Sequence, residues 1–270
     1  MTLVAFSTGL SLGKLFAAGI LPAFVLAVVM MIKIYLDCRK KNYIIDEKAS
    51  KREVWQSFRS AFPCLMMPVL MLVGIYSGIF TPTETAAVIS IYCLILAAAY
   101  KSLSLKNLFA IISESVRTVM LMAVICASST LFGYILSLEK VPQILVNLFA
   151  AHISSQWAFW GVMIVFFLIL GCFLDDSVSE LIIIPMLLPV VQSLGIDPLH
   201  FCVVAIVLIV MGLATPPVGM VLYMLEGVSS ISYERIAKAV VPYLGAILIG
   251  VIILIAVPGL STWLPALMFG

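Results

Sequence analysis

Three acidic residues lie within six positions of one another, between two strongly apolar stretches: Asp175, Asp176 and Glu180. A carboxylate inside a bilayer is costly unless it meets a cation, a polar partner or water. The flanking apolar stretches contain about 18 and about 11 residues, whereas about 20 are needed to cross a bilayer. This spacing favours a functional acidic site at membrane depth. Its alternative is a hydrated loop between two short spans.

A second apolar stretch is interrupted by Thr215-Pro216-Pro217-Val218-Gly219. The two prolines lack amide hydrogens, so two carbonyls of the preceding turn lose their helical donors, and Gly219 lets the backbone turn without a clash. In hydrocarbon each unsatisfied carbonyl would cost several kcal/mol. The sequence therefore predicts an unwound segment at membrane depth that belongs to an ion or substrate site. A simple proline kink is the alternative.

A third polar interruption, Ala127-Ser128-Ser129-Thr130, adds hydroxyl groups to another apolar stretch. Sodium is a hard cation that prefers oxygen ligands, and unwound backbone in a membrane offers carbonyls to cations and amides to anions. For any single serine or threonine, helix packing or a hydrogen bond to the preceding turn is the simpler interpretation. Together the interruptions predict a cation- or substrate-binding site, with Asp175 and Thr215 as the sodium ligands, from these residues: Ser128, Ser129, Thr130, Asp175, Ser177, Thr215, Pro216 and Gly219.

Other kinds of site are disfavoured by the sequence. It contains no GxxxxGK[ST] nucleotide-binding motif and no arginine-rich span of the voltage-sensor type. The six cysteines are scattered singly without CxxC spacing, and His152 and His200 fall in predicted interhelical loops. The carboxylates also lack a nearby nucleophile or metal-ligating histidine. We therefore expect neither an enzyme nor a cofactor other than sodium as a coupling ion.

The composition indicates that these groups lie in a membrane protein. Hydrophobic residues make up 64% of the chain and charged residues only 10%, against about 25% charged in soluble domains. Such a chain is an all-α, polytopic membrane protein whose first partner is the lipid bilayer. The net charge of +2 is too small to indicate nucleic-acid binding. Seven of the fifteen basic residues lie between Arg39 and Arg59, so the positive-inside rule places this loop in the cytoplasm.

Apolar runs predict the elements that position the site. The first three spans are expected at 15–36, 61–80 and 85–100, with a helix break in GIFTPTE between the second and third, and an interfacial arm helix is expected at 104–117. The stretch 119–138 and the short piece ending at 150 then fit a re-entrant hairpin, although one span followed by an interfacial helix is nearly as economical. Broken helices follow around 175–180 and 212–219, and 239–257 forms the last span.

Four motifs carry a resemblance to a known family: SLGKLFAAGILPA at 11–23, GIYSGIFTPTETAAV at 74–88, GCFLDDSVSELIIIPMLLPVVQSLGIDPLHF at 171–201 and GLATPPVGMVLY at 212–223. Over essentially its whole length the chain resembles the large membrane subunit of TRAP transporters. The resemblance implies a fold of inverted repeats with a re-entrant hairpin and broken helices, in which an elevator domain moves against a scaffold. Family members are longer, so we expect a truncated or split subunit that lacks the first repeat.

The resemblance also divides the chain and assigns roles within it. Residues 1–60 would hold a scaffold span and the basic loop, 61–118 two spans and the arm, and 119–270 the second transport repeat. The tip of its hairpin would lie at 126–131 (CASSTL), and its unwound helices at 175–179 and 215–219. Asp175 would matter more than Asp176. These segments would contribute the sodium and substrate sites.

The function that the resemblance implies is sodium-coupled uptake of organic anions, such as C4-dicarboxylates, sialic acid or other carboxylates. The chain would act in the bacterial inner membrane with a small integral membrane subunit and a periplasmic substrate-binding protein. The alternative is a non-transporting membrane fragment that keeps only scaffold or assembly contacts.

Overall fold

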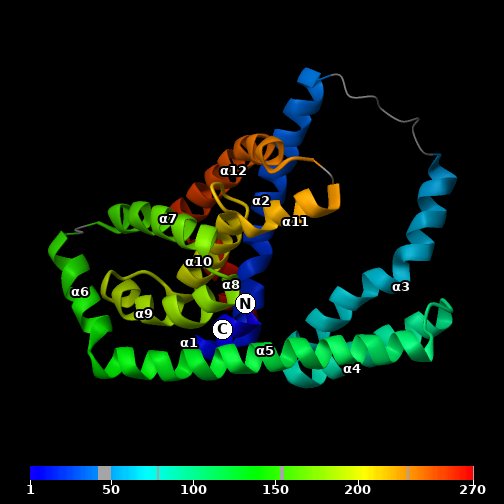
Figure 1. The fold of residues 1–270 in the computed structure, drawn as a ribbon, viewed down its shortest axis with the longest axis horizontal. Helices are drawn as coiled ribbons and strands as arrows, with labels where there is room; N and C mark the ends of the chain where they lie inside the picture. Colours follow the sequence, from blue (N-terminus) through cyan, green and yellow to red (C-terminus); the bar gives the residue numbers. More distant parts are fainter. Residues whose placement is uncertain (42–49, 78, 153–154, 230, 270) are drawn as a thin grey trace. The chain divides into compact units, whose positions relative to one another are not determined.

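The computed structural model describes residues 1–41, 50–77, 79–152, 155–229 and 231–269, and all regular structure in these ranges is helical (Figure 1). Seven helical segments of the described chain are long and apolar enough to cross a membrane. The predicted class, an all-α polytopic membrane protein, is therefore confirmed. The helices are α1 (Thr2–Thr8), α2 (Leu12–Lys41), α3 (Lys51–Tyr76), α4 (Pro82–Ala99), α5 (Leu105–Leu138), α6 (Val141–His152), α7 (Gln156–Phe173), α8 (Asp176–Val178), the π-helix η1 (Ser179–Ile183), α9 (Ile184–Ser193), α10 (Pro198–Leu213), α11 (Met220–Ser229), α12 (Tyr233–Ala256) and α13 (Gly259–Phe269).

The chain forms two compact units. The first consists of Met1–Lys41 and Val124–Gly270, and the second of Asn42–Ala123. In the second unit α3 and α4 form an antiparallel pair, in which the Tyr92 hydroxyl donates to the carbonyl of Pro63 at 2.8 Å. The helix break predicted between them is confirmed, since α3 ends at Tyr76 and α4 begins at Pro82.

The start of α3 differs from the expectation. The helix begins at Lys51 rather than near residue 61, so the second half of the predicted basic loop is helical. A capping box explains this early start, because the Ser50 hydroxyl accepts from the Glu53 amide while the Glu53 carboxylate accepts from the Ser50 amide. Residues 42–49 of the same predicted loop lie outside the described residues.

Helix α5 also differs from the expectation. The interfacial arm at 104–117 and the hairpin leg at 119–138 form one 34-residue helix, so the predicted interruption and tip at 126–131 are wrong. The segment contains no proline, and its hydroxyls bond back to the preceding turn, as Thr130 does to the Cys126 carbonyl at 2.8 Å. The chain instead turns at Glu139 and Lys140, where Lys140 takes a left-handed φ of 56°.

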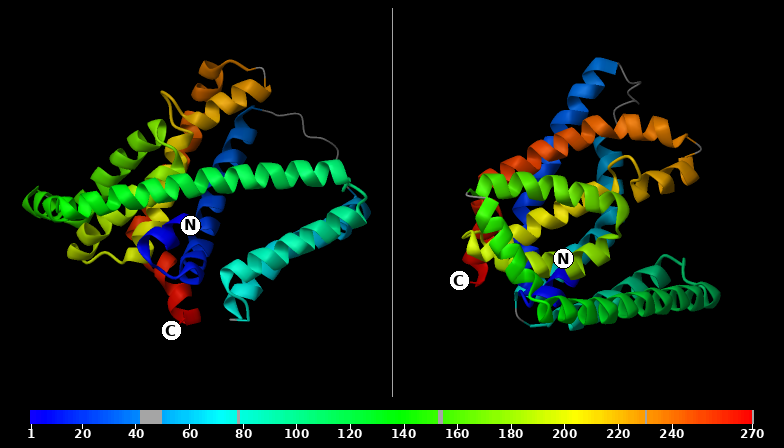
Figure 2. Two further views of the ribbon diagram at one scale, coloured as in Figure 1. Left: turned by 60° about the horizontal axis from the view of Figure 1, so that its bottom comes forward. Right: turned by 60° about the vertical axis from the view of Figure 1, so that its left-hand side comes forward.

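The core of the first unit lies around α7 and α10. Phe159 and Phe167 of α7 are fully buried against Phe201 of α10, and the ring centroids lie 6.2 and 6.3 Å apart. Segments far apart in sequence meet here, since α2 packs against α10, α12 and α13 (Figure 2). Helices α2 and α12 run antiparallel, because Lys33 lies over the ring of Tyr243 while Leu26 lies next to Gly250.

Candidate functional site

The first helix break follows α7. Leu174 and Asp175 are non-helical, and the chain resumes as α8 at Asp176. A side-chain oxygen of Asp175 accepts the Ser177 amide at 2.9 Å, so Asp175 acts as an N-cap. The break is therefore shorter than predicted: within 175–179 only Asp175 is unwound, because its carboxylate supplies the acceptor that lets the helix restart at once.

A wide helical turn follows this break. Residues 179–183 form a π-helix, a rare element that is frequent at functional sites. Its polar residues Ser179 and Glu180 are buried, as is Ser177 of α8, and the Ser179 hydroxyl donates to the Asp175 carbonyl at 3.2 Å. The Glu180 carboxylate lies 3.5 Å from the Met1 amine. Glu180 belongs to the acidic cluster predicted from the sequence, although neither it nor Ser179 was named as a cation or substrate ligand.

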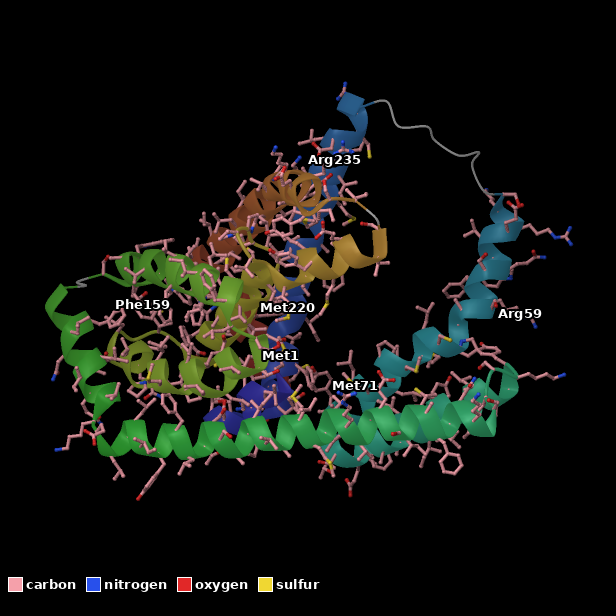
Figure 3. All side chains as sticks on the ribbon, in the orientation of Figure 1. Met1, Arg59, Met71, Phe159, Met220 and Arg235 are labelled. Atoms are coloured by element: carbon pink, nitrogen blue, oxygen red, sulfur yellow. The ribbon has the colours of Figure 1, made fainter. Side chains whose placement is uncertain are left out.

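The second break follows α10. Residues 214–219 are non-helical, and α11 begins at Met220, labelled in Figure 3. The Thr215 hydroxyl donates to the Met211 carbonyl at 2.8 Å, and Gly219 has a φ of +55°, which favours glycine. A Cβ at Gly219 would lie 3.0 Å from the Thr215 carbonyl oxygen. The predicted unwinding at 215–219 is confirmed, whereas its depth in a membrane stays a prediction.

The two breaks adjoin because the helices before them cross at glycines. A Cβ added at Gly171 of α7 would lie 2.7 Å from the Cα of Gly212 in α10, and one added at Gly212 would lie equally close to the Cα of Gly171. Directly after this crossing, the Cys172 thiol lies 3.3 Å from the Thr215 carbonyl oxygen and 3.8 Å from that of Pro216. The end of the first broken helix thus contacts the unwound part of the second.

A residue outside the predicted site also contacts the second break. The Tyr233 hydroxyl, from the first residue of α12, donates to the carbonyls of Pro217 at 2.8 Å and Val218 at 3.0 Å. No sequence pattern predicts this contact, because helix α11 and a loop separate the two partners.

The predicted hydroxyls of α5 are not brought to the breaks. Ser129 is buried, but Ser128 and Thr130 are exposed, and Thr130 is bonded within its own helix. Among the described residues, no hydrogen bond joins these three to the first or second break. Of the predicted residues the structure therefore gathers Asp175 and Ser177 at the first break and Thr215, Pro216 and Gly219 at the second.

The chemistry of the gathered groups is that of oxygen ligands. The described residues contain no group of three or more histidine, cysteine, aspartate and glutamate side chains suited to a metal ion. What the breaks offer instead is a carboxylate, hydroxyls and unwound backbone carbonyls. This donor set fits a hard monovalent cation such as sodium and does not fit a thiolate- or imidazole-loving metal.

Comparison with known proteins shows the family of this chain. The family model described as "Tripartite ATP-independent periplasmic transporter, DctM component" matches residues 1–260. The chain belongs to this family. The resemblance to the large TRAP subunit is thus confirmed, and its seven apolar helical segments make this DctM-family chain a multi-pass membrane protein.

Several relatives are named as large permease proteins of TRAP transporters. The sialic acid TRAP transporter large permease protein SiaM of Vibrio cholerae is 36% identical over 96% of this chain and 61% of its own length. The C4-dicarboxylate protein DctM of Pseudomonas aeruginosa is 35% identical over 98% and 62%. The 2,3-diketo-L-gulonate protein YiaN of Escherichia coli is 31% identical over 94% and 60%. The chain spans about three fifths of the length of these relatives.

Proposed function

We propose that this chain belongs to a TRAP-type transporter that takes up organic anions by symport with sodium. The observation that carries the proposal is the contact of Cys172, two residues before the first break, with the Thr215 carbonyl of the second break, next to the Gly171–Gly212 crossing. Two adjoining breaks concentrate unwound backbone in one place, which is how secondary transporters build ion and substrate sites. Asp175, Ser177 and Thr215 would then supply side-chain oxygens to sodium.

The proposed substrates are carboxylates. The relatives are named for sialic acid, C4-dicarboxylates and 2,3-diketo-L-gulonate, all of which carry a carboxylate group. A carboxylate is attracted to the free amides at the start of a helix, and α11 begins directly after Gly219 of the second break. Pro216 and Gly219 would thus shape the segment directly before α11, whose first amides would bind the substrate.

The proposed partners follow from the tripartite family. A periplasmic substrate-binding protein would deliver the anion, and a small integral membrane subunit would accompany the chain in the bacterial inner membrane. The surface of the second unit suits membrane partners, since Phe62, Val73 and Ile91 are large, apolar and exposed.

The direct test is uptake by proteoliposomes that hold the complete transporter containing this chain, with its binding protein outside. Labelled sialic acid and a labelled C4-dicarboxylate would be offered under an inward sodium gradient, with an equal potassium gradient as the control. We expect uptake of one of these anions to depend on sodium. Equal uptake under the potassium gradient would refute coupling to sodium. No uptake of any carboxylate would refute the proposal that the substrates are carboxylates.

A further inference from the structure

The unwound segment of the second break is held from outside by one side chain. Tyr233 lies 16 residues beyond Pro217 in sequence, yet its hydroxyl donates to the carbonyl oxygens of Pro217 and Val218, at 2.8 and 3.0 Å. A phenol hydroxyl has a single proton, so these two consecutive carbonyls share it. No other side-chain hydroxyl of the described residues bonds to two carbonyls of a helix break.

These carbonyls need an external donor because the helix is interrupted. In a continuous α-helix the Val218 carbonyl would accept the amide of residue 222. Here the Leu222 amide donates to the Gly219 carbonyl instead, at 2.8 Å. Backbone oxygens without a donor are costly in an apolar environment, so the segment needs another partner to keep a single shape. The Tyr233 hydroxyl is that partner.

Tyr233 is itself fixed in place from several sides. Its ring stacks on Tyr223 of α11 with centroids 4.6 Å apart, and its amide donates to the Glu226 carboxylate at 3.0 Å. It also packs against the buried cluster of Leu222 and Ile236 that joins α11 to α12. A hydroxyl anchored in this way has little freedom, so it defines where the two carbonyls point.

We propose that Tyr233 is a positioning residue of the second break, which holds the Pro217 and Val218 carbonyls so that Thr215 and Pro216 keep their place beside Cys172. Tyr233 touches neither Thr215 nor the first break in the described contacts, so it acts through the backbone between them. The role rests on the proposed sodium site, because positioning matters for function only if this segment binds the ion.

The test compares Tyr233→Phe with Tyr223→Phe in the complete transporter. Both variants keep the stacked rings, but only the first removes the hydroxyl that reaches the break. We expect Tyr233→Phe to raise the half-saturating sodium concentration about fivefold, with the maximal rate at saturating sodium within twofold of wild type, which corresponds to about 1 kcal/mol of net hydrogen bonding. Tyr223→Phe should leave both values unchanged.

The half-saturating sodium concentration and the maximal rate together distinguish a positioning effect from a folding defect. A variant that merely folds poorly lowers the maximal rate and leaves the half-saturating sodium concentration where it was. That result would overturn the proposal, as would an equal shift in both variants. If the wild-type transporter shows no sodium dependence, the proposed function fails, and amide hydrogen exchange decides the positioning role alone. Faster exchange at residues 218–222 in Tyr233→Phe than in Tyr223→Phe would support it, and equal exchange would overturn it.

Discussion

Gly171 and Gly212 set the distance between the two helix breaks, because their Cα atoms approach more closely than any side chain allows. Adding a methyl group at Gly171 would place it 2.8 Å from the Ile209 carbonyl oxygen, and backbone cannot give way as a flexible side chain does. We expect Gly171→Ala to destabilise the protein by about 1 to 3 kcal/mol, as overpacking does, and to reduce uptake. Thermal unfolding in detergent and uptake in proteoliposomes measure the two effects.

Gly161 offers the matched control on the same helix. A Cβ there would meet nothing within 4 Å, so Gly161→Ala should be neutral or slightly stabilising through helix propensity. Equal losses in Gly161→Ala and Gly171→Ala would show that the crossing is not the cause.

Thr215 is the hydroxyl most directly placed at the second break. Its Oγ donates to the Met211 carbonyl, which leaves the oxygen lone pairs available to a cation. Thr215→Val keeps the shape of the side chain and removes that oxygen. We expect a higher half-saturating sodium concentration with unchanged membrane insertion. Thr118→Val serves as the control, since Thr118 bonds back to Glu114 in the same way on exposed α5. Unchanged sodium affinity in Thr215→Val would show that Thr215 is not a sodium ligand.

The two neighbouring aspartates differ in backbone position. Asp175 is the non-helical cap, whereas Asp176 is the first residue of α8, and both carboxylates accept the Ser177 amide at 2.9 Å. Asparagine caps helices as well as aspartate does, so Asp175→Asn removes the charge while it keeps the cap. We expect Asp175→Asn to abolish sodium-dependent uptake and Asp176→Asn to spare it. Equal uptake by the two variants would mean that the distinction is wrong.

At this scale, sequence reasoning found the residues whose effect is local. Pro216 and Pro217 break a helix wherever they fall, because they lack amide hydrogens, and Asp175 caps the residues that follow it. Cys172 and Tyr233 were missed because their partners lie 43 and 16 residues away along the chain. Only the packing of α7, α10 and α12 brings such pairs together.

Among the helices, α5 shows that a polar stretch need not interrupt a helix. Serine and threonine are tolerated inside a helix when their hydroxyls bond to the preceding turn, and without proline nothing ends the helix at Ala127–Thr130. The breaks predicted in GIFTPTE and within 212–219 are confirmed, and each contains proline and glycine as well as polar residues. Polarity alone did not distinguish a break from a continuous helix.

Hydrogen exchange can test this distinction between elements. In the complete transporter, amides from Val119 to Leu138 should exchange slowly and uniformly, since each lies in the hydrogen-bonded ladder of α5. The amides of Ala214, Thr215, Val218 and Gly219 should exchange faster than those within α10, which ends at Leu213. Fast exchange confined to residues 127–130 would instead support the helix break that the sequence predicted there.

On the scale of the whole molecule, composition alone was sufficient to predict a polytopic helical protein, since a chain with 64% hydrophobic residues cannot keep its surface in water. Orientation follows from charge. Helices α2 and α12 run antiparallel, so Arg39 near the end of α2 lies at the same end of the first unit as Arg235 at the start of α12. Arg235 is labelled in Figure 3. By the positive-inside rule we expect this end to face the cytoplasm.

Cysteine labelling tests that orientation in each unit separately. A cysteine placed at Ser232, before α12, and one at Ser50, before α3, should resist a membrane-impermeant thiol reagent added from the periplasm. The exposed native thiols of Cys38 and Cys64 would first be replaced by serine. Labelling of either new cysteine from the periplasm would show that the predicted orientation of its unit is wrong.

The crossing of α7 and α10 has a consequence for alternating access. With Gly171 against Gly212, the two backbones already touch, so no gate can open between the two breaks without pulling the helices apart. In the transporter that we propose, an ion bound at the breaks could not leave between these two helices. Exposure to one side of the membrane and then the other would require both breaks to move as a single body, or a change in the segments that cover them.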